Sequence, residues 1–199
     1  MRRLALVALF AGAITGGAKG DQLLLAGTLP PGLNTLSVTA GRPLSGLRLD
    51  RGLLSWLDGG VYLDSALRRF FRPGLGGRAR LFRSGCGGFT ARAGLGYVLP
   101  RLSGDSSWGP RKLSRSANGE LGLGADLGLG ADCSVALFAE VGTLVDTDFS
   151  TVRSQAYLHT VAGVEWAPWR PLSLLAKAGE LRGFNGSRTM ISGGAALRF

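Results

Sequence analysis

Few residues of this sequence could carry out chemistry. His159 is the single histidine, and no Cys-x-x-Cys pair or group of Cys and His residues accompanies it. A nucleophile is activated by a base that a third group orients, and a zinc site needs several thiolate or imidazole ligands. Gly-x-Gly spacings occur in residues 122–130, but they do not open a helix as a phosphate-binding loop does. The sequence therefore predicts no catalytic residue, no metal site and no cofactor.

Charged residues recur at alternate positions among apolar ones. In a β-strand, alternate side chains point to opposite faces, so these charges would share one face. Six are basic and seven acidic, a balance that favours an internal network of ion pairs. The predicted network comprises Arg48, Asp50, Asp58, Asp64, Arg78, Arg80, Arg92, Glu120, Asp126, Glu140, Glu165, Lys177 and Arg198.

The elements that would hold these charges are strands of period two. Ile191, Gly193 and Ala195 fall on one face of the last segment, with Ser192 and Arg198 on the other. The same alternation predicts ten strands, at Leu33–Ala40, Leu47–Leu53, Leu57–Leu67, Arg78–Ser84, Phe89–Leu99, Glu120–Leu129, Cys133–Thr143, Leu158–Trp166, Leu172–Gly179 and Thr189–Phe199. One face suits lipid and the other a polar lumen, which predicts an all-β, closed antiparallel transmembrane barrel.

Two alternatives concern the first third of the chain. A helix over Ser55–Phe71 would align Trp56, Leu63 and Leu67 on one face, although Gly59 and Gly60 disfavour it. If residues 21–56 lie outside the barrel, eight strands remain. Both readings stay open at this point.

The first twenty residues predict a signal for export. Met1–Arg3 is positively charged, Leu4–Ile14 is apolar but too short to span a bilayer, and small residues surround Ala18. This is the pattern of a secretory signal peptide, and a buried N-terminal helix is the alternative. We expect a signal peptide at residues 1–20 and one barrel domain at residues 21–199, a length that suits a single domain.

The formal net charge of +10 is not explained by the balanced lumen charges. Short turns alternate with longer polar segments at Leu102–Asn118, Asp146–Ser154 and Gly183–Arg188, which we expect to be outer loops. Arginine binds phosphate with two parallel hydrogen bonds, so a basic outer rim would suit lipopolysaccharide, and solvated loop tips are the alternative. The predicted rim comprises Arg68, Arg69, Arg72, Arg101, Arg111, Lys112, Arg115, Arg153, Arg182 and Arg188.

Cys86 and Cys133 fall in predicted turns at the same end of the barrel. An even pair in an exported protein favours a disulfide. The two turns would be two strand spacings apart, about 10 Å, whereas a disulfide needs Cα atoms within about 7 Å. The bridge and two free thiols both remain open.

The signal peptide, the strand pattern over residues 33–199 and a terminal strand that ends in Phe199 together resemble small bacterial outer-membrane β-barrel proteins. The resemblance implies a bacterial outer-membrane location, insertion by the barrel assembly machinery, and an assembly signal at Phe199. The aromatic girdle is sparser than in that family, with Tyr97, Tyr157, Trp166 and Trp169 as its members. Val161 and Tyr157 stand where barrel lipases and proteases would have a Ser and an Asp near the histidine.

We therefore expect a structural or envelope-interaction role, with lipid and lipopolysaccharide as partners, no nucleic acid, and a monomeric state. A narrow porin-like channel for small solutes is the alternative. An envelope lipid-modifying enzyme is the third hypothesis.

Overall fold

The computed structural model describes residues 28–42, 44–66, 70–100, 115–130, 132–149, 151–169, 171–183 and 186–199. The predicted signal peptide and residues 21–27 lie outside this part. Within it, no helix is long and apolar enough to cross a membrane. The strands are β1 (Asn34–Arg42), β2 (Ser45–Leu54), β3 (Leu57–Ala66), β4 (Phe70–Ser84), β5 (Gly87–Pro100), β6 (Ser116–Leu129), β7 (Val135–Asp148), β8 (Arg153–Trp169), β9 (Leu172–Gly183) and β10 (Gly186–Arg198).

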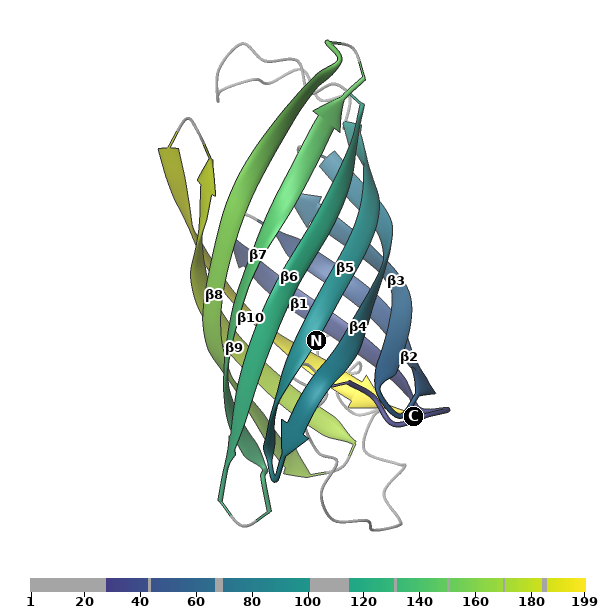
Figure 1. Cartoon of the computed structure of the whole chain (residues 1–199), viewed down its shortest axis with the longest axis vertical. Coiled ribbons are helices and arrows are strands. Elements are labelled where there is room, and N and C mark those ends of the chain that lie inside the picture. The colour runs from purple at the N-terminus through teal and green to yellow at the C-terminus, as the bar shows by residue number, and fades with distance from the viewer. Residues whose placement is uncertain are drawn as a thin grey trace, which may run out of the picture.

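The ten strands form one closed antiparallel barrel (Figure 1). Each strand pairs with its neighbours in the chain, and β10 closes the ring against β1, with Leu197 opposite Leu36. Phe199 N donates to Asn34 O at 3.1 Å, and Asn34 N donates back to Phe199 O at 3.0 Å. The prediction of ten strands is confirmed, and the helix over Ser55–Phe71 is wrong, because β3 and the start of β4 occupy that stretch.

The outer surface of the barrel is apolar. Large apolar side chains at alternate positions point away from the lumen and are exposed, for example Leu95 at 71% and Leu121 at 65%. Closure pairs the backbone groups of every strand on both sides, which a structure in lipid requires. An apolar outer band around a polar interior is the arrangement of a transmembrane barrel.

Glycines on the inner face make room for large lumen side chains. A Cβ at Gly74 would lie 2.2 Å from Cζ of Tyr62, and one at Gly96 would lie 2.8 Å from its hydroxyl. A Cβ at Gly163 would similarly lie 2.6 Å from Cζ of Phe138. Glycine is therefore needed at these three positions for steric reasons, because the rings of Tyr62 and Phe138 occupy the space that a Cβ would take.

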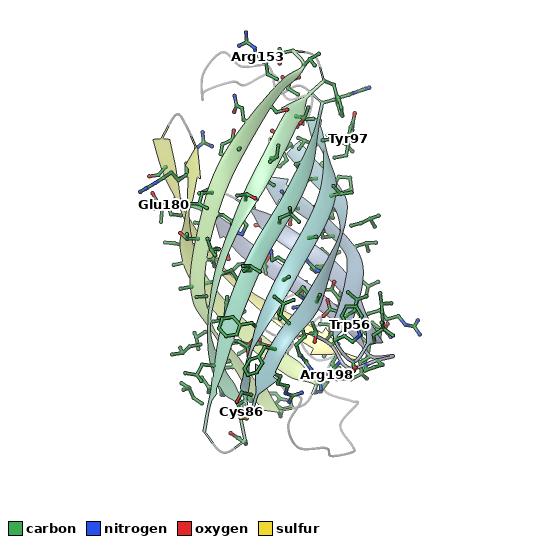
Figure 2. The ribbon with its side chains drawn as sticks, in the orientation of Figure 1. Trp56, Cys86, Tyr97, Arg153, Glu180 and Arg198 are labelled. Carbon is green, nitrogen blue, oxygen red and sulfur yellow. A yellow bond between two sulfur atoms is a disulfide. The ribbon has the colours of Figure 1, made fainter. Side chains whose placement is uncertain are left out.

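One end of the barrel, called here the lower end, carries the described chain ends and the short turns that follow β2, β4, β6 and β8. Figure 2 shows Trp56, Cys86 and Arg198 there, and Arg153 at the opposite, upper end. Exposed aromatic side chains gather at the lower end, and they include Trp56, Phe82 and Phe199, which the predicted girdle lacked. Trp166 and Trp169 of the predicted girdle are exposed as well.

The strands run further than the alternation predicted. The expected outer loop Asp146–Ser154 is mostly strand, because β7 continues to Asp148 and β8 begins at Arg153. The expected loop Gly183–Arg188 likewise overlaps both strands, because β9 continues to Gly183 and β10 begins at Gly186. Beyond the apolar band both faces of a strand are polar, as where Thr147 and Ser154 meet at 3.0 Å between hydroxyls. The period-two signal therefore disappears although the pairing continues.

Candidate functional site: the lumen and its rims

The lower lumen contains a buried ion pair. Asp58 on β3 and Arg78 on β4 are direct partners in the ladder. Arg78 donates from Nε to Asp58 Oδ1 at 3.1 Å and approaches Oδ2 with Nη2 at 2.9 Å. The backbone N–H of Leu29 donates to the same Oδ2 at 2.9 Å. Asp58 is 0% exposed, so its charge depends on these donors in place of water.

The chain segment that precedes β1 enters this layer. Thr28 O accepts a hydrogen bond from Arg80 Nη2 at 3.0 Å, and Leu29 packs against Ala196 of β10. Gly32 N donates to Gly52 O, and Gly52 N donates to Leu33 O, both at 2.9 Å. We call residues 28–33 the strap. No sequence pattern predicted it, because its residues lie in a proline-containing stretch without alternation.

Two residues of the strap, Thr28 and Leu29, lie in a layer that water does not reach, whereas Pro31 and Gly32 are exposed. Within the described part of the chain, the largest fully buried side chains belong to the strap or to the lower ends of strands around the ring. They are Leu29, Thr35, Asp58, Glu165 and Ser173. This layer, called here the dry layer, places polar and apolar groups together across the lower lumen.

The middle of the lumen is wetter. Arg92 on β5 pairs with Glu120 on β6 and with Glu140 on β7, the latter at 2.5 Å from Nη1 to Oε2. These side chains remain between 16% and 29% exposed. On β2, Arg48 and Asp50 pair at 2.6 Å. Ion pairs therefore line the lumen, as the alternation of charges predicted.

Among the predicted rim residues that the structure describes, Arg72 is the exception. It lies on β4, faces inward, and donates from Nε to Asp64 Oδ2 at 3.0 Å. Its guanidinium carbon stands 5.4 Å from the centre of the Tyr62 ring, within the range of a cation–π contact. Its prediction as a rim residue was wrong, because the alternation of side chains predicted a strand that begins at Arg78, whereas β4 begins at Phe70.

The other predicted lumen residues also face inward. Arg80 binds backbone carbonyls in this structure, those of Thr28 and Ser55. By their positions on the strands, Asp126, Glu165, Lys177 and Arg198 share the inner face. His159 is buried in the lumen beside Gly142. A Cβ at Gly142 would lie 2.5 Å from Cε1 of His159.

Four basic residues of the predicted rim stand exposed toward the upper end: Arg115 directly before β6, and Arg153, Arg182 and Arg188 on strands. Arg182 lies 3.5 Å from Glu180 on the same strand, and both side chains are well exposed. The remaining predicted rim residues, Arg68, Arg69, Arg101, Arg111 and Lys112, lie outside the described residues.

Cys86 and Cys133 form a disulfide, with their Cα atoms 5.8 Å apart. The expected separation of two strand spacings was too long because Cys86 itself extends the pairing with β6. Its carbonyl accepts a hydrogen bond from Gly128 N at 3.0 Å. A Cβ at Gly128 would lie 2.5 Å from Cβ of Cys86, so glycine leaves the space that the bridge occupies.

No family model matches the sequence, and no curated protein matches it. Among solved structures, a bacterial polysaccharide outer-membrane secretin is similar over 81% of this chain and 57% of its own, at 10% identity and a TM-score of 0.53. OccAB4 of Acinetobacter baumannii matches over 83% and 56%, at 9% identity and a TM-score of 0.28. Ail, the attachment invasion locus protein of Yersinia pestis, matches over 85% and 99%, at 14% identity and a TM-score of 0.25.

The chain spans less than two thirds of the length of the secretin and of OccAB4. The likeness to the secretin concerns the fold alone, and the other two TM-scores are too low to add to it. The fold and the apolar outer surface define the class: the chain is a transmembrane β-barrel of the outer-membrane type.

Proposed function

We propose that this protein is an integral barrel of the bacterial outer membrane with a structural or envelope-interaction role, and that its lumen is not an open path for solutes. The dry layer carries this proposal. Asp58, Glu165 and Leu29 are all withdrawn from water at one level of the lumen. A hydrated ion that crossed this level would have to displace paired and hydrogen-bonded groups, because an unpaired buried charge costs several kcal/mol (on the order of 3–5).

Conductance tests the closed lumen. Purified protein refolded into planar bilayers should give no steady ionic current, while remaining folded by the gel shift between unboiled and boiled samples. A steady current through the wild-type barrel would refute the closed lumen and support the narrow-channel alternative. Recovery of the mature protein as a soluble periplasmic monomer would refute the location.

We further propose that the upper rim contacts the phosphate groups of lipopolysaccharide. Support comes from Arg153 and Arg188, which are exposed on strand segments above the apolar band. Each basic charge near an anionic membrane surface contributes about 1 kcal/mol before screening, and the Debye length at physiological salt is about 8 Å. Binding should therefore weaken steeply as salt is raised.

A matched pair of variants tests the rim. Arg153→Gln/Arg188→Gln removes two charges from the upper end, whereas Arg51→Gln/Arg83→Gln removes two exposed charges from the lower half of the barrel. The first variant should lose affinity for lipopolysaccharide vesicles, and the second should bind as the wild type does. Equal losses in both variants would mean that net charge, and not the upper rim, governs binding.

A further inference from the structure

The contacts that hold the strap differ from those that hold the ten barrel strands, which we call the wall. Each wall strand is held by a ladder on both sides, whereas the strap is held at a few points. These are the Leu29 amide on Asp58, the Thr28 carbonyl on Arg80, the backbone bonds with Gly52, and one apolar contact of Leu29 with Ala196. The polar contacts could all be replaced by water, so detaching the strap leaves the barrel ladder intact.

The strap also reaches across the strands on both sides of the closing seam. Its contacts lie on β2, β3 and β4 and, beyond β1, on β10. Leu29 itself is 0% exposed and lies in the dry layer with Asp58. Above that layer, the paired side chains around Arg92 are partly exposed to water. The lower closure of the lumen is thus partly made by a segment that is not wall.

From this arrangement we propose that residues 28–33 are a removable strap that closes the lower mouth of the lumen, and that the barrel opens toward small hydrated ions when the strap leaves. The inference rests on the proposed closed lumen and assigns that closure to the strap. The charged groups left at the mouth, Asp58, Arg78 and Arg80, would then face water.

Gly52 offers a way to displace the strap without changing any charge. A Cβ at Gly52 would lie 1.9 Å from Pro30 O and 2.6 Å from Pro30 C, both backbone atoms of the strap. Gly59, on the neighbouring strand β3, is the matched control. Its Cβ would be 3.5 Å from the nearest atom, an ordinary contact. Gly52→Ala should therefore expel the strap, and Gly59→Ala should leave it in place.

The position of the strap can be read by thiol labelling. The two native cysteines are joined in the disulfide, so Leu29→Cys would add a single reactive thiol. In the parent background it should react slowly with a water-soluble maleimide, compared with Arg51→Cys at an exposed position. Adding Gly52→Ala should accelerate labelling of Leu29→Cys by about tenfold or more, since protection of a buried group is lost when its segment opens. Adding Gly59→Ala should not.

Ionic current across planar bilayers is the second measurement that tests the strap. The proposal expects a steady current from Gly52→Ala and none from the wild type or Gly59→Ala. If the wild type conducts, the proposed closed lumen itself fails. If the wild type is closed and Gly52→Ala either conducts nothing or leaves Leu29→Cys protected, the closed lumen stands and the strap proposal is overturned. Should Gly52→Ala fail the gel-shift test for folding, Arg80→Met, which removes the donor to Thr28 O, takes its place under the same criteria.

Discussion

Replacing Asp58 by Ala should cost this barrel a large part of its stability. The substitution removes the acceptor of two contacts from Arg78 and of one from the Leu29 amide. It leaves the guanidinium of Arg78 in the dry layer without its carboxylate. Breaking a buried ion pair from one side costs about 3–5 kcal/mol, which corresponds to a loss of roughly 10²- to 10³-fold or more in the folding equilibrium.

The exposed pair Glu180–Arg182 supplies the control. Its atoms are 3.5 Å apart and its side chains are 39% and 68% exposed. Surface pairs contribute about 0–1 kcal/mol, so Glu180→Ala should change the free energy of unfolding by less than about 1 kcal/mol.

Urea unfolding of the refolded protein in lipid vesicles, followed by tryptophan fluorescence, measures both variants. Asp58→Ala/Arg78→Met should recover part of the loss, because the double change no longer leaves a buried charge unpaired. A cost for Asp58→Ala no larger than that for Glu180→Ala would refute the view that the pair is buried and dependent on its partners.

Three further predictions concern other parts of the chain. Alkylation without reductant should leave Cys86 and Cys133 unmodified in mass spectra, and two alkylated thiols in exported protein would contradict the bridge. Replacing both cysteines by Ser should lower the free energy of unfolding by up to about 4 kcal/mol, because the bridge closes a loop with a sequence separation of 47 and so reduces the entropy of the unfolded chain. The Ser134 amide donates to Asp132 at 3.2 Å and holds the pKa of that carboxyl below its ordinary value of 3.8. The stability that Asp132 adds relative to Asp132→Asn should therefore be complete above pH 3.8 and disappear as the pH falls through the lowered pKa, as pH-dependent unfolding would show. Deletion of Phe199 should reduce the fraction of protein that shows the gel shift in membranes, because it removes the expected assembly signal and the backbone bonds to β1, and unchanged assembly would discard that role.

The number of strands and the faces of their side chains could be predicted from the sequence. The direction of a side chain in a strand depends only on its odd or even position along that strand, which we call its parity. Arg92 and Glu140 could therefore be placed inside without knowledge of any partner. The limits of this reasoning lie where alternation ends. Arg72 follows the inward parity of β4, but its Pro- and Gly-containing stretch gave no reason to begin the strand at Phe70.

Which residues contact each other, in contrast, was decided by the tertiary structure. Asp64 pairs with Arg72 because the register of β3 and β4 sets them opposite each other, and Cys86 reaches Cys133 because its carbonyl continues the ladder to Gly128. The strap is the extreme case. Leu29 packs against Ala196 only because closure of the barrel brings the start and the end of the described part of the chain to the same mouth. Parity is a local property of each strand, whereas register and closure depend on the whole ring.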